Sequence, residues 1–232
     1  MTENSSHAEQ AAARFDDWAG RYGEDRISPW FAHYQTKALS MLNLRHDTNF
    51  LDVGCGVGKA VGQAALEIGE GKACGIDISP KMIEKARMLN PDDRRTDFRV
   101  ADSESIPFED NYFDSILCTF SFHHYLHPIR VLKDICRVLR PGGRFVLIDS
   151  ARDTSFAIWL QDRGRRYLER SHVRYYTVAE LKNMLKKTDL RLTEEITTVT
   201  KFMDHGKTFT GLMIAQCSKD ERPAYSTEEA GR

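Results

Sequence analysis

The segment Leu51–Gly58 (LDVGCGVG) constrains the fold more than any other part of the chain. It completes a short apolar run, Asn49–Val53, and precedes a helical pattern that begins at Lys59. Glycines at such a strand-to-helix turn let the backbone bend sharply and approach a ligand closely, with the helix N–H groups facing that ligand. Asp77 ends the next apolar run, 21 residues after Gly56, where a carboxylate can accept both ribose hydroxyls of an adenosine. Together these features predict an adenine-nucleoside site at the carboxyl edge of a doubly wound sheet.

After residue 48, short apolar or β-branched runs alternate with helical patterns, and this alternation requires a parallel sheet with right-handed crossovers. The sequence therefore predicts an α/β fold with a doubly wound, Rossmann-like sheet. The predicted strands are Asn49–Val53, Ala73–Asp77, Asp97–Val100, Ser115–Phe120 and Arg144–Ile148, and the predicted helices between them are Lys59–Ile68, Pro80–Leu89 and Ile129–Leu139.

Helix-start signals place further elements. Ser28 and Pro29 mark the start of a helix, because serine favours the N-cap and proline the first helical position. Thr177 and Glu180 form a capping box ahead of a predicted helix over Val178–Lys187.

These signals divide the chain. Residues 1–47 are predicted to form an N-terminal helical cap, and residues 48–218 the core domain, with an insertion near 155–176. The polar stretch 219–232 is predicted to be a disordered tail.

Two residues of the glycine loop argue against a dinucleotide. The G-x-G-x-x-G fingerprint needs a glycine where this chain has Lys59. Asp52 places a carboxylate where pyrophosphate would lie, and a carboxylate repels phosphate but suits a ligand that carries an ammonium and a sulfonium. S-adenosylmethionine (SAM) is such a ligand.

The chain resembles the class I SAM-dependent methyltransferases in four motifs, which follow in the family's order between residues 50 and 150. The motifs are LDVGCGVGKA, GIDISPKMIEKAR, VADSESIPFEDNYFDSILC and RVLRPGGRFVLID. The likeness is closest to the small-molecule branch that includes quinone-biosynthesis C-methyltransferases, and FDDWAGRYGEDR resembles the segment before the core in that branch. The resemblance implies a seven-stranded sheet that is mostly parallel and ends in an antiparallel pair, here Leu192–Val199 and Thr208–Cys217.

The resemblance also implies SAM as the cofactor, released as S-adenosylhomocysteine. Asp77 matches the acid that binds the ribose, Asp102 matches the acid that binds the adenine amino group, and Tyr22 matches an aromatic residue that closes over the methionine end. The predicted cofactor-binding residues are Tyr22, Asp52, Gly54, Cys55, Gly56, Gly58, Asp77, Ile78, Met82, Asp102, Ser103 and Cys118.

The stretch Cys118–Tyr125 follows the fourth strand, where the family places substrate-facing groups. His123, His124 and Tyr125 are the candidate general bases for an acceptor that is a phenol or an enol. Each histidine could instead orient the loop through a backbone hydrogen bond. No metal is expected, because the pair His123 and His127 has no third ligand nearby.

The predicted function is transfer of the SAM methyl group to a small organic acceptor by in-line displacement. The alternatives are a SAM-binding protein without catalysis and a nicotinamide-dependent oxidoreductase. C-, O- and N-methylation all stay open. The basic stretch 163–174 either contacts an anionic substrate or a lipid surface, or is a solvated helical face with Trp159, Leu160 and Tyr167 packed beneath it.

Composition and charge limit the classes of partner that the sequence predicts. A formal net charge of −1 gives no field that would attract nucleic acid, so none is expected as a partner. No apolar run reaches the ~20 residues that span a bilayer, so no integral membrane contact is expected. The five cysteines form no C-x-x-C pair and are typical of free thiols in a reducing cytoplasm, which is the predicted location. A homodimer is left open.

Overall fold

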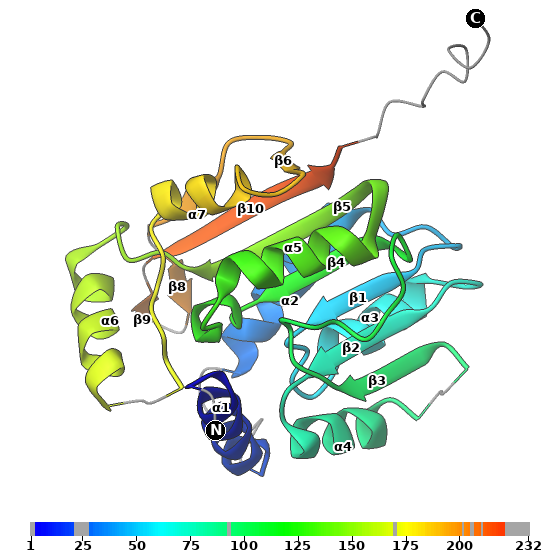
Figure 1. Cartoon of the computed structure of the whole chain (residues 1–232), viewed down its shortest axis with the longest axis horizontal. Coiled ribbons are helices and arrows are strands. Elements are labelled where there is room, and N and C mark those ends of the chain that lie inside the picture. The colour runs from blue at the N-terminus through cyan, green and yellow to red at the C-terminus, as the bar shows by residue number, and fades with distance from the viewer. Residues whose placement is uncertain are drawn as a thin grey trace, which may run out of the picture.

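The computed structural model describes residues 3–20, 28–91, 94–168, 171–200, 202–204, 207–209 and 211–220. At its centre lies one sheet with the order β3-β2-β1-β4-β5-β10-β6, in which β7 also pairs with β10 (Figure 1). Its strands are β1 (Phe50–Val53), β2 (Ala73–Asp77), β3 (Thr96–Val100), β4 (Phe113–Thr119), β5 (Leu139–Ser150), β6 (Leu190–Leu192), β7 (Thr197–Val199) and β10 (Leu212–Lys219).

The predicted mixed sheet is confirmed. Strands β3, β2, β1, β4 and β5 pair in parallel, whereas β10 pairs antiparallel with β5. The predicted last-but-one strand, 192–199, is interrupted: β6 and β7 pair with opposite ends of β10, so the sheet has seven positions but eight strands. The strand order reverses between β1 and β4, and ligands bind at the carboxyl ends of such a switch point.

Helices cover both faces of the sheet (Figure 1). One apolar core joins the sheet to α2 (Ser28–Leu42), α3 (Lys59–Glu67) and α4 (Pro80–Leu89). A second core on the other face joins it to α5 (Pro128–Val138) and α7 (Val178–Leu185). Among the residues that the structure describes, no helix is both long and apolar enough to cross a bilayer.

The predicted helix starts are present. Ser79 caps α4, and its Oγ accepts a hydrogen bond from the backbone N of Met82 at 3.1 Å. Thr177 and Glu180 form both hydrogen bonds of the capping box at α7. α3 begins after Gly58, whose φ of +74° is left-handed and whose added Cβ would lie 2.6 Å from the Phe98 ring. Glycine is therefore required there by the backbone and by packing.

The predicted N-terminal segment forms two helices with separate positions. α2 belongs to a sheet-covering layer, whereas α1 (Glu3–Ala19) packs on α4 at the carboxyl edge of the sheet. Asp16 of α1 accepts hydrogen bonds from the Ser79 hydroxyl and from the backbone N of Lys81. The Lys85 ammonium donates to the carbonyl of Ala19 at 2.9 Å.

Two further parts lie outside these layers. α6 (Phe156–Leu168) occupies the predicted insertion, and β8 (Phe202–Asp204) pairs with β9 (Lys207–Phe209) in a separate hairpin. Lys219, predicted to begin the tail, instead ends β10, and its buried ammonium donates to Asn111 and to the carbonyl of Leu139. Residues 221–232 of the predicted tail lie outside the described residues.

Candidate active site

A pocket opens above the carboxyl ends of β1, β2 and β4, with α1 across it. Its cavity volume is about 130 Å³. Its walls come from the glycine loop, the ends of β2, β3 and β4, and α1. They are His7, Ala8, Ala11, Phe15, Trp18, Gln35, Gly54, Cys55, Gly56, Asp77, Ile78, Met82, Asp102, Ser103, Glu104, Thr119, Phe120, Ser121, His124, Tyr125 and Leu126.

The glycine loop forms the floor. Gly54 has a φ of +77°, and an added Cβ would meet the Ser121 side chain at 2.6 Å. Gly56 has a φ of +52°, and a Cβ there would meet nothing within 4 Å. The loop therefore leaves open space above Gly56, which is the space that a ligand in close contact with the backbone requires.

Asp77 connects this loop to α4. One carboxylate oxygen accepts from the backbone N of Gly56 and the other from the backbone N of Ser79, both at 2.9 Å. Burial raises the pKa of Asp77, although these two donors oppose the shift. A carboxylate has about four acceptor positions, so Asp77 keeps capacity for the two hydroxyls of a ribose.

Asp52 lies beneath the loop, fully buried on β1. Neither of its carboxylate oxygens has a hydrogen-bond partner among the described residues. Burial, and then the charge of Asp77, raise its pKa to about 8. Buried carboxylates are normally paired with a cation or with donors, and the Asp52 side chain lacks both among the described residues. The ammonium and sulfonium of SAM supply positive charge, and the residues present fit that cofactor.

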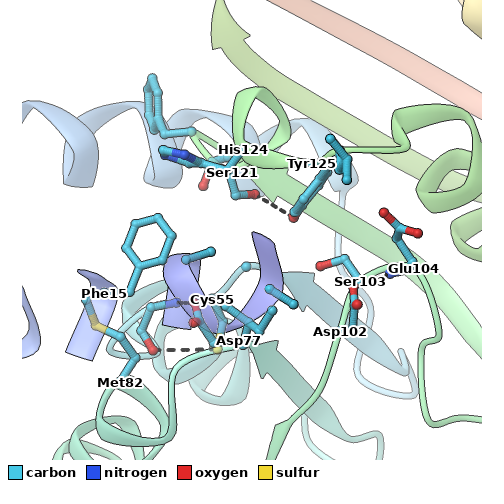
Figure 2. Close-up of a pocket in the computed structure, with 18 of the residues that line it drawn as sticks. Phe15, Cys55, Asp77, Met82, Asp102, Ser103, Glu104, Ser121, His124 and Tyr125 are labelled. Atoms are coloured by element: carbon cyan, nitrogen blue, oxygen red, sulfur yellow. Dashed lines mark hydrogen bonds between the residues drawn. The ribbon is translucent and has the colours of Figure 1, made fainter. Parts of the chain in front are cut away.

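The edge of the pocket beside α4 is formed by apolar side chains, and the acidic residue Asp102 lies with them in the lining. Met82 is buried and packs with Val57 and Ala19, and Trp18 and Phe15 of α1 lie against this group. Asp102 follows β3, and its Oδ1 accepts from the backbone N of Glu104 at 2.9 Å. Figure 2 shows Asp77, Met82 and Asp102 on the side of the pocket opposite Ser121 and His124.

A hydroxyl pair forms the wall after β4 (Figure 2). The Tyr125 hydroxyl donates to the Ser121 hydroxyl at 2.9 Å, and Ser121 in turn donates to the carbonyl of Val53 at 3.0 Å. Burial raises the pKa of Tyr125 well above its usual value, so its hydroxyl stays protonated. These two hydrogen bonds connect the loop after β4 to the end of β1.

His124 borders the same pocket with a defined tautomer. Its Nδ1 lies 2.7 Å from the carbonyl oxygen of Ser171, which can only accept, so Nδ1 carries the proton. Nε2 of the neutral ring then keeps its lone pair. Burial, and then His123, lower the pKa of His124 well below its usual value, so the ring is neutral at physiological pH. Phe15 packs edge-on against it, with ring centroids 4.9 Å apart.

His123, the neighbouring candidate base, does not border the pocket. It is buried, its Nδ1 lies 2.7 Å from Asp149 Oδ1, and its backbone N donates to Asp149 Oδ2 at 2.9 Å. Burial lowers the pKa of His123 and raises that of Asp149 to about 6. This pair anchors the loop to β5 through a side-chain contact. The backbone hydrogen bond that the alternative interpretation expects is instead made by His124, to the Ser171 carbonyl.

Other predicted cofactor-binding residues also lie away from the pocket lining. Gly58 is turned toward Phe98, and Cys118 is fully buried with its Sγ 3.2 Å from the Ser121 hydroxyl. Tyr22 lies outside the described residues. The remaining predicted residues line the pocket, except Asp52 beneath it. All five cysteines are free and buried, as predicted.

Several lining residues were not among those predicted from the sequence. Ser121 stands within the stretch that was singled out, whereas His7, Ala8 and Ala11 reach the pocket only because α1 crosses the sheet edge. Gln35 donates from α2 to the Thr119 hydroxyl at 3.4 Å. Its one sequence signal is an amide within a largely apolar helix. Among the described residues, no three His, Cys, Asp or Glu side chains are grouped so that they could hold a metal.

The chain is similar to known methyltransferases. A family model described as a methyltransferase domain matches residues 51–147, from the glycine loop through most of β5. A demethylmenaquinone methyltransferase of Staphylococcus saprophyticus is 27% identical over 161 residues, which are 67% of this chain and 68% of that protein. One from Staphylococcus aureus is 28% identical over 160 residues, or 66% of each.

Solved structures share the fold. A Haloferax volcanii putative methyltransferase, described in complex with the Trm112 methyltransferase activator, superposes with a TM-score of 0.74 at 20% identity and covers 92% of this chain and 99% of that chain. A possible histamine N-methyltransferase from Thermotoga maritima gives 0.67 at 20% identity, over 90% and 100% of the two chains. These matches identify a methyltransferase domain in this chain. The four ordered motifs, the sheet order and the buried carboxylate beneath the glycine loop agree with a domain similar to the class I SAM-dependent methyltransferases.

Proposed function

We propose that the chain methylates a small organic acceptor that must lose a proton, a phenol or an enol, and that His124 takes this proton. The observation that carries the proposal is the fixed tautomer of His124, whose Nδ1 proton is held by the Ser171 carbonyl while the ring borders the pocket. A neutral imidazole that keeps a lone pair, in a ring that borders the pocket, is the arrangement that general-base catalysis needs.

The cofactor half of the proposal assigns three acids. Asp52 compensates the positive charge of the methionine end, because its buried carboxylate otherwise has no partner. Asp77 holds the ribose through the acceptor positions that Gly56 and Ser79 leave open. Asp102 accepts from the adenine amino group, while Ile78 and Met82 pack beside the ring.

SAM supplies a methyl group that is already activated by a sulfonium, so the protein has mainly to align the acceptor and exclude water. The α1 side chains Phe15 and Trp18 exclude water on one side of the pocket. The hydroxyls of Ser121 and Tyr125 hold the β4 loop in position. His124 removes the acceptor proton, which raises the nucleophilicity of the attacking atom.

The names of the relatives support an acceptor of this kind, because demethylmenaquinone is a ring compound with quinone oxygens. The five buried thiols support a reducing compartment such as the cytoplasm.

The first test is calorimetric titration with SAM and S-adenosylhomocysteine, with NAD as the control ligand. We expect both sulfur nucleosides to bind and the Asp77→Ala variant to lose at least about tenfold in affinity. Binding of NAD in their place would contradict the cofactor assignment.

The second test follows radiolabelled methyl transfer to phenolic, enolic and amine acceptors. His124→Gln should reduce the rate with phenols by about 10²–10⁴-fold and leave SAM affinity unchanged. The matched control is His127→Gln, because His127 lies outside the pocket lining. Equal rates in both variants would remove His124 from the mechanism, and SAM binding without transfer to any acceptor would favour the non-catalytic alternative.

A further inference from the structure

Helix α6 carries its apolar side chains on the outside. Phe156, Leu160 and Tyr167 recur at helical spacing, so they share one face, and they are 75%, 56% and 91% exposed. Trp159 and Leu168 flank this face at 40% and 82% exposure. The rings of Phe156 and Trp159 stack with centroids 5.5 Å apart. Amphipathic helices normally turn such a face toward the core.

The inner side of α6 is polar and explains this orientation. Asp162 is the one buried residue of the helix. It accepts hydrogen bonds from His172 Nε2 at 2.9 Å, from the backbone N of Tyr175 at 2.6 Å, and from Arg166. Burial alone would raise the pKa of Asp162, but these donors outweigh it and hold the pKa below the usual value. Rotating α6 to bury its apolar face would remove this carboxylate from its donors.

The outer face also carries a cation. Arg163 lies within it, with its guanidinium 5.4 Å from the centroid of Trp159. Arg166 instead donates to the inward-facing Asp162, which is the only carboxylate on α6. Aromatic and aliphatic side chains around an arginine match the boundary between anionic headgroups and acyl chains. Pairing of two such helices about a two-fold axis would instead bring like charges together.

The position of α6 gives this surface access to the site. Figure 1 shows α6 outside the layers that cover the sheet, connected to the segment that passes α1. That segment includes Ser171, whose carbonyl holds His124 and whose hydroxyl accepts from Arg14 of α1. The exposed face and the acceptor side of the pocket are therefore joined by one short stretch of chain.

We propose that the outer face of α6, formed by Phe156, Trp159, Leu160, Arg163, Tyr167 and Leu168, docks the protein onto an anionic lipid bilayer. The apolar side chains enter the headgroup boundary, and the Arg163 guanidinium contacts the lipid phosphates. The docking does not depend on the proposed acceptor, although it would place the pocket beside a lipophilic one.

The test is co-sedimentation of the full chain with vesicles of equal parts phosphatidylglycerol and phosphatidylcholine, compared with phosphatidylcholine alone. We expect binding to the anionic vesicles that weakens as salt is raised. Replacing Phe156, Leu160 and Tyr167 together by serine should reduce the bound fraction at least about tenfold, because each buried side chain contributes strongly. Arg163→Glu should also reduce it.

The matched control replaces Leu66, Met88 and Leu89 by serine, since these are 81%, 75% and 57% exposed on α3 and α4. This variant should bind vesicles like the wild type. The proposal is overturned if the wild type does not sediment with anionic vesicles, or if the α6 variant binds as well as the control. It is also overturned if light scattering shows that the α6 face holds two copies together without lipid. Because all variants should bind SAM equally by calorimetry, failure of docking is distinguishable from failure of the proposed function.

Discussion

At the scale of single residues, the least ordinary group is Asp52. A carboxylate that is fully buried and unpartnered destabilises the protein when it ionises. For this reason the pKa of Asp52 in the folded protein is raised to about 8. The position of Asp52 beneath the glycine loop suits a cationic ligand, and such a ligand would offset this loss of stability.

This predicts an unusual pH dependence of the ligand-free protein. The folded pKa of Asp52 lies above the unfolded value of 3.8, so the stability that its protonated form contributes is lost as pH rises toward about 8. Between about pH 7 and 8.5 the loss is about 1 kcal/mol, or ~2–4 °C in Tm for a chain of this size. Asp52→Asn should keep a nearly constant Tm in this range by calorimetric scanning. A wild-type Tm that stays equally constant would contradict the raised pKa.

Substitutions at Gly56 and Gly58 should separate an effect on SAM binding from an effect on the stability of the fold. Alanine at Gly58 would meet the Phe98 ring, so we expect Gly58→Ala to lower Tm clearly, by about 1–3 kcal/mol of stability. Alanine at Gly56 meets no protein atom, so Gly56→Ala should cost only the ~1 kcal/mol of its left-handed backbone but weaken SAM binding more than tenfold. Thermal scans and titration of both variants check this. Equal SAM affinity in Gly56→Ala and the wild type would show that the ligand does not approach the loop.

At the scale of elements, Asp162 connects α6 to the segment that carries His172 and Tyr175. We expect Asp162→Asn to lose about 1–3 kcal/mol locally, because the uncharged amide replaces charge-assisted hydrogen bonds. Hydrogen exchange should then accelerate at the amides of Val173, Arg174 and Tyr175. Asp47→Asn is the control, since its ion pair with Arg45 is exposed on both sides. Unchanged exchange in Asp162→Asn would show that α6 is held by other contacts.

The sequence predicted the start of a helix well where a residue type has one main structural role, as in helix capping. Thr177 and Glu180 cap the helix that they were expected to begin. The division of 192–199 into β6 and β7 was not predictable, because it depends on pairing with distant positions of β10. The orientation of α6 was equally hidden, since its periodic pattern alone is that of a helix whose apolar face is buried.

At the scale of the whole molecule, the sequence predicted the cofactor side of the pocket much better than the acceptor side. Asp77, Asp102 and the glycine loop are close to strand ends, and parallel strands bring such ends to one edge. The α1 residues His7, Ala8 and Ala11 reach the same pocket by tertiary packing over α4, for which no sequence spacing exists. Likewise, tertiary contacts distinguish the two histidines: His123 bonds to Asp149, whereas His124 bonds to Ser171 and borders the pocket.

The antiparallel position of β10 has a consequence for how the protein is made. β10 lies between β5 and the short strands β6 and β7, and it is the last strand of the described chain. During synthesis, β5 therefore emerges early and keeps one edge unpaired until residues 212–219 leave the ribosome. An open edge of this length can recruit other chains. β10 thus covers the open edge of β5, and a nascent copy is most vulnerable to aggregation before β10 has paired.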